Sequence, residues 1–541
     1  MDVRAKLAQM FQEVIDPSDQ YALREPVIQK EYLVNGELRE WQGDFLEVRS
    51  PICEKKGDHF ERKRIGAFPQ LTEKEAQEAL QAAVDAYQNG CGVWPTMTVE
   101  ERIECVEQFL FEMLEAKQFI VTMIMWEIGK SVDDAVTEFD RTVAYIRDTI
   151  EALKELDRQS SRFVKESGIM AQIRRAPFGV VLCMGPFNYP LNETFTTLIP
   201  ALIMGNVIVF KPPKLGVLLY QPLLKAFQKA FPAGVVNTVY GRGAKVVGPL
   251  METGRIDSLA FIGTSKVADV LKHQHPKPHR LKCILGLDAK NPAIIMEDAD
   301  MDLAVRESLL GTLSFNGQRC TAIKMLFVHQ SIAPEFIQRL SAGIREMNIG
   351  MPWEPEVKIT PLPENNKTAD LTKLVEDALR HGAQVVNEFG GTVKETFFYP
   401  AVLFPVNEHM KAYQVEQFGP VIPIVPFSEI ETPLHYIIES NFGQQVSIFC
   451  RDPYRIATLV DQLVNQVCRV NINSQCQRGP DILPFNGRKD SAEGTLSVSD
   501  ALRAFTIRTL VAAKENNTNK EIIRTILKDD LSSFISTDFI L

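Results

Sequence analysis

Apolar positions between residues 74 and 155 repeat at three- and four-residue spacing, which is the spacing of one helix face. One run shares this spacing throughout: Ile103, Val106, Phe109, Leu110 and Met113. We therefore expect this region to be helical. The charged segment that follows, residues 163–175, is expected to be extended.

From residue 180 the pattern changes, and short β-branched runs alternate with helix-length segments. The expected strands are 180–184, 207–210, 235–240 and 259–262. The expected helices between them are 194–204 and 215–230. This alternation favours a parallel sheet with helices on both faces.

A second series begins near residue 283. Its expected strands are 293–296, 325–328, 421–425, 446–450 and 470–472, and its expected helices are 301–313, 335–347 and 454–465. The fold class is therefore α/β, with two α/β domains. Residues 516–541 are polar and then weakly amphipathic, and we expect them to form an appended tail.

Composition narrows the class of protein. A chain of 541 residues suggests roughly two to four domains. Its 45% apolar and 24% charged residues are typical of a soluble globular protein, and its net charge of -10 disfavours nucleic acid as a partner. The most apolar stretch, 198–210, is interrupted by Pro200, Gly205 and Asn206 and is too short to span a membrane.

Residues 1–18 lack an apolar core followed by a small-residue cleavage site, so we expect no secretory signal. The nine cysteines are scattered, and none forms a metal-type Cys-x-x-Cys pair. We expect a reduced, cytoplasmic protein without a metal site.

One cysteine has the surroundings of a nucleophile. The run FNGQRCT, residues 315–321, places Cys320 after a glycine turn and directly after Arg319. A thiolate is the reactive form, and a neighbouring cation or helix end lowers a cysteine pKa. A lone cysteine is nevertheless more often a small core residue.

Two further segments follow predicted strands. Ligands of open α/β sheets bind beyond the carboxyl ends of the strands. In the run PFNYP, residues 186–190, the Asn188 amide can donate to a developing oxyanion, although an ordinary turn is the alternative. In the run KPPK, residues 211–214, Lys211 can bond ribose hydroxyls and Lys214 can pair with an extra phosphate, the alternative being a solvated basic turn.

Two more segments suit parts of a dinucleotide. Gly263, Thr264 and Ser265 follow a strand and open a helix, which fits a pyrophosphate or a plain helix cap. The fingerprint G-x-G-x-x-G is absent, and Gly241-Arg242-Gly243 does not complete it. Glu416 can hold a ribose diol and Phe418 can pack on a flat cofactor, unless this run is only the start of a strand.

In this order the five segments resemble the aldehyde dehydrogenase superfamily over residues 71–511. Within it the chain is most similar to the NADP-dependent, non-phosphorylating glyceraldehyde-3-phosphate dehydrogenases. The likeness rests on the runs PFNYPLN (186–192), KPP (211–213), GRG (241–243), GQRCTA (317–322) and QRG (477–479). It implies NADP, with NAD as the alternative, and further cofactor contacts from Pro186, Phe187 and Gly243.

The resemblance also implies the architecture. We expect a Rossmann-like cofactor domain over 1–283, which includes part of a small β oligomerisation element at about 160–176. A catalytic domain would span 284–470, and residues 471–515 would return to the first domain and to the oligomerisation element. The tail, 516–541, lies outside the likeness, and the family implies a homodimer or homotetramer.

The substrate implied is a phosphorylated aldehyde. In the family, arginines matching Arg141, Arg319 and Arg478 gather at the substrate phosphate, with Tyr189 beside them. Guanidinium groups suit a phosphate dianion because they are planar and permanently charged. For each arginine, an ordinary salt bridge is the alternative.

The implied reaction starts with attack of Cys320 on the aldehyde, with the oxyanion held by Asn188. Hydride transfer leaves a thioester, which water hydrolyses. The family's general-base glutamate falls on Gly286 in the run GLDAKNP, residues 286–292. Asp288 lies two residues later and either reaches the water or is structural.

Three outcomes follow from the missing glutamate. A replacement base supports hydrolysis, or coenzyme A accepts the acyl group, or the chain has lost turnover and serves as a binding paralogue. An intact nucleophile, oxyanion donor and cofactor lysine argue against the third.

Overall fold

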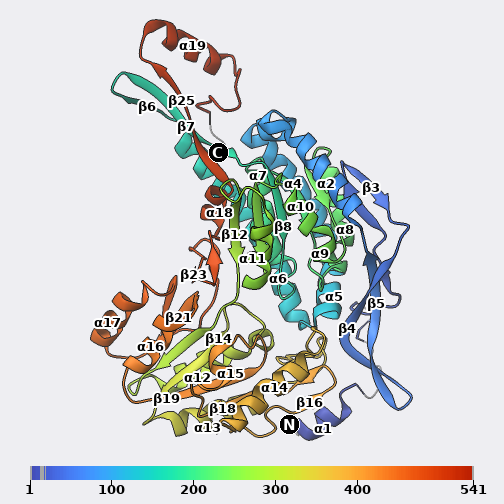
Figure 1. Ribbon diagram of the computed structural model, residues 1–541, viewed down its shortest axis with the longest axis vertical. Helices are drawn as coiled ribbons and strands as arrows, with labels where there is room; N and C mark the ends of the chain where they lie inside the picture. The colour runs from blue at the N-terminus through green and yellow to red at the C-terminus, as the bar shows by residue number, and fades with distance from the viewer. Residues whose placement is uncertain (1–2, 12–16, 19, 539–541) are drawn as a thin grey trace.

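Two β-sheets form the framework of the computed structural model, which describes residues 3–11, 17–18 and 20–538 (Figure 1). Residues 1–2 and 12–16, which belong to the stretch expected to lack a secretory signal, and residues 539–541 of the expected tail lie outside the described residues. The first sheet has the order β10-β9-β8-β11-β12-β24. Its strands are β8 (Val180–Met184), β9 (Val207–Lys211), β10 (Val236–Thr238), β11 (Ser258–Ile262), β12 (Lys282–Gly286) and β24 (Ala492–Glu493).

Neighbours from β10 to β12 are parallel, and only β24 is antiparallel, so the predicted parallel sheet is confirmed. Its surrounding helices include α2 (Glu73–Tyr87), α4 (Val99–Glu115), α5 (Lys117–Ile128), α6 (Val132–Ser160), α7 (Asn192–Ile203), α8 (Gln221–Ala230) and α11 (Ser265–Gln274). Capping boxes at Thr72 and Thr98 fix the starts of α2 and α4. On α4, the ring of Phe109 stacks on that of Phe227 of α8 at 4.5 Å.

The helix predicted from residue 215 begins later than expected. Gly216 has a φ of +80°, and a Cβ there would lie 2.4 Å from the Cβ of Pro190. The chain therefore passes through this turn and the 3₁₀ turn η2 (Leu218–Tyr220) before α8 starts.

The second sheet has the order β15-β18-β19-β14-β13-β21-β22 and comes from one continuous stretch of chain. Its strands are β13 (Asn291–Ile295), β14 (Ile323–His329), β15 (Gln384–Val385), β18 (Ala401–Phe404), β19 (Val421–Phe427), β21 (Gln445–Phe449) and β22 (Arg469–Ile472). Its helices include α12 (Met301–Leu313), α13 (Ala333–Glu346), α14 (Lys367–Arg380), α16 (Glu431–Glu439) and α17 (Pro453–Leu463). The predicted second α/β series is therefore present, with α14, α16, β15 and β18 in addition.

Strands before residue 70 were not predicted. They are β1 (Val27–Ile28), β2 (Glu31–Val34), β3 (Glu37–Glu40), β4 (Phe45–Lys56) and β5 (His59–Pro69). The register of β4 with β5 shifts twice, between Val48 and Arg49 and between Arg49 and Cys53. Around these shifts four consecutive residues, Ser50 to Cys53, are buried, so β4 lacks the strict alternation that identifies a strand in sequence.

A three-stranded arm projects from the body (Figure 1). It pairs β25 (Thr506–Lys514) with β7 (Ile169–Pro177) and β7 with β6 (Phe163–Glu166), so the segment predicted to be extended is confirmed. The expected tail contains α19 (Asn517–Lys528), and its backbone carbonyls at Phe534 and Ser536 accept hydrogen bonds from Arg174 and Gln172 of β7. Within the described residues, no helix has the length and apolar character needed to cross a membrane.

Candidate active site

A large cavity of about 1530 Å³ opens at the carboxyl ends of β8, β9, β11 and β12, and residues from the stretch of chain that forms the second sheet also line it. Every predicted site residue except Ser265 lines it. These residues are Arg141, Pro186, Phe187, Asn188, Tyr189, Lys211, Lys214, Gly243, Gly263, Thr264, Asp288, Arg319, Cys320, Glu416, Phe418 and Arg478. Residues from distant parts of the chain therefore meet where ligands of open α/β sheets bind.

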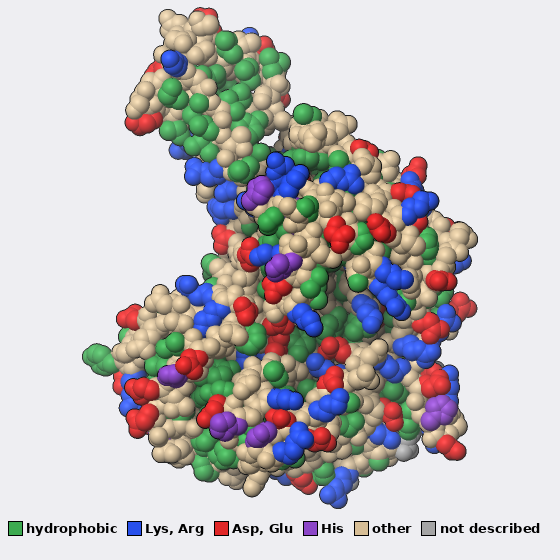
Figure 2. All heavy atoms as spheres, in the orientation of Figure 1, with side chains coloured by type: hydrophobic (Ala, Val, Ile, Leu, Met, Phe, Trp, Pro, Cys, Tyr) green, Lys and Arg blue, Asp and Glu red, His purple; other side chains and the backbone are tan. Residues whose placement is uncertain are grey.

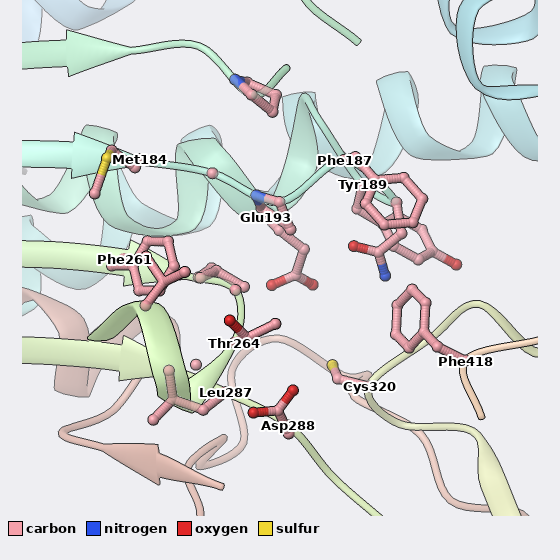
Figure 3. A pocket seen from close by; sticks show the side chains of 18 of the residues that line it. Met184, Phe187, Tyr189, Glu193, Phe261, Thr264, Leu287, Asp288, Cys320 and Phe418 are labelled. Carbon is pink, nitrogen blue, oxygen red and sulfur yellow. The ribbon is translucent and has the colours of Figure 1, made fainter. Parts of the chain in front are cut away.

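The loop that carries Cys320 is held by a left-handed turn after α12. Phe315, Asn316 and Gly317 all have positive φ, at 47°, 56° and 70°. The Asn316 side-chain amide exchanges two hydrogen bonds with Thr360, at 3.0 and 2.9 Å. A Cβ at Gly317 would lie 2.6 Å from the carbonyl oxygen of Thr312, so only glycine fits here. This turn presents Cys320 to the cavity (Figure 3).

The electrostatic environment of Cys320 differs from the one expected. Burial raises its pKa, and the negative charge of Glu193 raises it further, while Lys324 and Arg478 lower it. The expectation of a lowered pKa beside Arg319 is wrong for this structure. The Arg319 guanidinium instead donates to the carbonyl oxygens of Leu310 and Gly311, both at 3.0 Å, near the C-terminal end of α12.

Asn188 lies beside the cysteine loop and is 5% exposed. Its Nδ2 donates to the carbonyl oxygen of Gln318 at 2.9 Å. An amide nitrogen carries two hydrogens, so this bond leaves one to donate to a ligand oxygen. The arrangement is compatible with an oxyanion donor next to Cys320.

The strand-end wall, which we define as Lys211, Lys214, Gly263, Thr264 and Asp288, forms one side of the cavity. Lys211 donates to the carbonyl oxygen of Pro212 at 3.1 Å, and burial lowers its pKa to about 8. Lys214 is exposed.

Ser265 does not face this cavity. It begins α11, and its backbone N–H donates to Asp288 Oδ2 at 2.7 Å. Asp288 thus satisfies a free N–H at the start of that helix, as a capping residue does. This bond favours the structural alternative for Asp288.

Glu416 and Phe418 line the cavity from the loop just before β19 of the second sheet. Glu416 forms an ion pair with Lys324. The Lys324 side chain is almost fully buried, and it was not among the residues predicted for the site. The Lys324 Nζ lies 5.3 Å from the centre of the Phe418 ring, and that ring meets Phe187 edge-on at 5.8 Å. The Glu416 carboxylate is therefore already paired in this structure.

The arginine wall, which we define as Arg141, Tyr189, Glu193, Arg319 and Arg478, forms the other side. Beneath it, the Lys130 ammonium lies 3.3 Å from the centre of the Tyr189 ring and forms a fully buried ion pair with Glu138. This pair fixes the aromatic part of the wall from behind.

Two carboxylates meet the arginines. Arg141 binds Asp481 through two hydrogen bonds, at 2.8 and 2.7 Å. Arg478 pairs with Glu193 and also lies 3.2 Å from Asp481, and its Nη2 donates to the Leu496 carbonyl oxygen at 2.9 Å. The three arginines share one cavity as predicted, but two of them are in the salt bridges that were the alternative.

Glu193 and Asp481 were not identified from the sequence. Asp481 follows Arg478 by three residues, and Glu193 lies four residues beyond Tyr189, in the first turn of α7. Those spacings were the available signal, since residues three or four apart can meet on one side of a turn or helix.

The sequence profile of the aldehyde dehydrogenase family matches residues 53–511. The chain belongs to the aldehyde dehydrogenase family. It is therefore an oxidoreductase.

Relatives of this aldehyde dehydrogenase include the NADP-dependent glyceraldehyde-3-phosphate dehydrogenase of Streptococcus equinus. It is 32% identical over 455 residues, which cover 82% of this chain and 92% of the relative. The protein of the same name from Pisum sativum is 29% identical over 442 residues, 80% of this chain and 86% of the relative.

Solved structures agree. The NADP-dependent glyceraldehyde-3-phosphate dehydrogenase of Bacillus halodurans C-125, complexed with NADP, has a TM-score of 0.83 at 30% identity and covers 90% of this chain and 99% of its own. The glyceraldehyde-3-phosphate dehydrogenase of Methanocaldococcus jannaschii, also with NADP, has a TM-score of 0.76 at 26% identity, with 84% and 97% covered. The predicted α/β aldehyde dehydrogenase fold is confirmed.

This aldehyde dehydrogenase has no carboxylate at the end of β12. Gly286 lines the cavity there, and a Cβ on it would lie 3.2 Å from a methyl carbon of Leu496. Within the described residues, no group of histidine, cysteine and carboxylate side chains is suited to hold a metal ion.

Proposed function

We propose that this aldehyde dehydrogenase oxidises an aldehyde with NADP through a thioester on Cys320, and that glyceraldehyde 3-phosphate is its substrate. The observation that carries the proposal is the presence of Cys320, Asn188 and Lys211 in one cavity at the strand ends. The names of the relatives support the choice of cofactor and substrate.

The residues of the strand-end wall suit NADP. Lys211 is placed to bond ribose hydroxyls, the turn at Gly263 and Thr264 lies at the start of α11, and exposed Lys214 is free to meet a 2′-phosphate. NAD lacks that phosphate and is the alternative cofactor. Bound NADP would supply the hydride acceptor.

Cys320 and the groups around it have separate roles in the reaction. The Cys320 sulfur bonds to the aldehyde carbon, and the Asn188 amide and the Cys320 backbone N–H hold the oxygen that becomes negative. Departure of hydride leaves the thioester. Attack by water on the acyl carbon then releases the acid and restores the thiol.

The substrate phosphate would meet Arg141, whose side chain is 28% exposed, whereas that of Arg478 is 4% exposed. Because Asp481 and Glu193 already neutralise charge there, we expect a weaker preference for phosphate than three unpaired arginines would give.

A single-turnover experiment tests the proposal. The protein is mixed with NADP and glyceraldehyde 3-phosphate, and NADPH is followed by absorbance. Continued turnover supports an NADP-dependent, hydrolytic enzyme. A burst of one NADPH per subunit, followed by turnover only when coenzyme A is added, would identify an acyl-transferring enzyme instead. The absence of any NADPH formation would favour a binding paralogue.

We also propose that this enzyme is cytoplasmic and that it forms a homo-oligomer. All nine cysteines are free thiols, which suits the reducing cytoplasm. Apolar side chains are exposed along the arm, at Ile507, Leu510 and Val511 of β25 (Figure 2). We propose that they lie in the interface of a homodimer or homotetramer, which light scattering in solution would test.

A further inference from the structure

Hydrolysis of a thioester on Cys320 needs a group that takes a proton from the attacking water. In the described part of the chain, the carboxylates that line the cavity are Glu193, Asp288, Glu364 and Glu416. Three of them are in ion pairs: Glu364 with Lys367 at 3.1 Å, Glu416 with Lys324, and Glu193 with Arg478. Pairing alone therefore does not identify the base, and the position of each carboxylate relative to Cys320 has to decide.

Asp288 lies with the cofactor side of the cavity. One of its oxygens accepts from the backbone N–H of Ser265. Burial raises the pKa of the Glu416 carboxyl, and the charge of Asp288 adds to that rise. Burial also raises the pKa of the Cys320 thiol, and there the charge that adds most is that of Glu193.

Glu193 enters the cavity from the opposite wall. Figure 3 shows its carboxylate directed from α7 into the space where Cys320 and Thr264 lie, while Asp288 approaches from the other side. Its Oε2 accepts from Arg478, and no hydrogen bond to Oε1 is present among the described residues. One oxygen is thus anchored and the other is able to accept from a water.

The anchoring is rigid. The turn before Glu193 is held because Leu191 and Asn192 donate their backbone N–H groups to the buried Glu138 carboxylate, at 3.0 and 3.2 Å. Arg478 is held in turn by the carbonyl oxygen of Leu496 and by Asp481. Arg478 is thus shared between two carboxylates, Glu193 and Asp481, and its charge is divided between them.

We propose that Glu193 is the general base for deacylation in this enzyme and takes over the task for which Gly286 has no side chain. The water oxygen bonds to the acyl carbon as its proton passes to Glu193 Oε1, the C–S bond breaks, and Cys320 leaves as the thiolate. Glu193 then releases the proton to solvent. The inference rests on the proposed thioester chemistry.

The test is Glu193→Gln, which keeps the size of the side chain and its bond to Arg478 but cannot take the proton. We expect an intact burst of one NADPH per subunit and a steady-state rate lower by about 10²- to 10⁴-fold, the usual range for loss of a general base. Intact-protein mass spectrometry should show the trapped acyl group. Added hydroxylamine should restore turnover, because this nucleophile needs no base.

Glu107→Gln, at an exposed position of α4, is the matched control and should behave as the unmodified enzyme. Thermal unfolding of each variant checks the fold. If Glu193→Gln does not fold, Glu193→Asp makes the same test, with an intact burst and a slowed, still measurable, steady state.

Several results would overturn the proposal. Unchanged steady-state turnover in Glu193→Gln would show that Glu193 is not the general base. Loss of both the burst and the turnover would assign Glu193 to substrate binding instead. Accumulation of acyl-enzyme in Asp288→Asn instead would assign the task to Asp288. Absence of NADPH formation by the unmodified enzyme would instead refute the proposed function.

Discussion

The strand-end wall and the arginine wall face each other across one cavity, yet their charges are used differently. On the first, Lys214 is exposed and has no ion-pair partner among the described residues. On the second, Arg141 and Arg478 are bonded to Asp481 and Glu193. A positively charged side chain is therefore open on one wall, whereas Arg141 and Arg478 are neutralised on the other.

This difference shows that a set of arginines in one pocket does not by itself define an anion site. Burial of a charge is expensive unless a partner and hydrogen bonds accompany it. The carboxylates that offset the cost of burying the arginines also reduce the net positive charge available to a substrate phosphate. One of those carboxylates, Glu193, lines the same cavity as the nucleophile Cys320.

The largest expected effect is on stability, from removing the partner of a buried carboxylate. Arg478→Met leaves Glu193 buried without its ion pair, and we expect the free energy of unfolding to fall by about 3–5 kcal/mol. Urea unfolding followed by circular dichroism measures this. Lys229→Met, in a surface pair with Glu112, is the control and should cost under about 1 kcal/mol. Equal losses would mean that the Arg478 pair is not specially stabilising.

The second expectation concerns Cys320, which lies between the two walls. Its pKa is raised by burial and by Glu193, so the reactive thiolate is a minor species at neutral pH in the cofactor-free protein. Iodoacetamide alkylation should therefore speed up about tenfold per unit between about pH 6.5 and 8.5. Peptide mass spectrometry reports the rate, with exposed Cys91 as internal reference. A rate that is constant from about pH 6.5 would show a lowered pKa instead.

A third experiment opens the arginine wall. Asp481→Asn removes the carboxylate shared by Arg141 and Arg478, which frees positive charge for a substrate phosphate. The ratio of kcat/KM for glyceraldehyde 3-phosphate to that for glyceraldehyde should rise about tenfold, near 1.4 kcal/mol. Asp461→Asn on the surface of α17 should leave the ratio unchanged. A fall in the ratio would show that Asp481 serves mainly to position the arginines.

The smallest effect is expected on the strand-end wall. Lys214→Glu should lower the preference for NADP over NAD several-fold, because a carboxylate repels the 2′-phosphate and the site is exposed. Kinetics with both cofactors at two salt concentrations measure it. The effect should shrink at high salt, since exposed charges are screened. An unchanged preference for NADP over NAD at low salt would show that Lys214 does not take part in cofactor recognition.

The strand-end residues could be predicted from the sequence because a geometric rule connects them. Parallel strands end at one edge of a sheet, so Asn188, Lys211 and Thr264 had to lie near one another once their strands were recognised. Cys320 joined them through a recognised motif rather than through periodicity.

Charge pairing could not be predicted in the same way. Arg141 and Asp481 lie 340 residues apart, and no local pattern connects them. The raised pKa of Cys320 depends on burial and on Glu193, which three-dimensional packing alone brings close. The strands before residue 70 were missed for a local reason, because register shifts in β4 interrupt the alternation of apolar and polar residues.

The order of strands along the chain has a consequence for synthesis on the ribosome. The second sheet is complete once residue 472 has emerged, whereas the first sheet lacks its edge strand β24 until residue 493. The core of that first domain also includes Leu502 and Phe505, which are fully buried. We therefore expect the stretch of chain that forms the second sheet to fold during translation, while the earlier-made first sheet stays incomplete until its last segments have emerged.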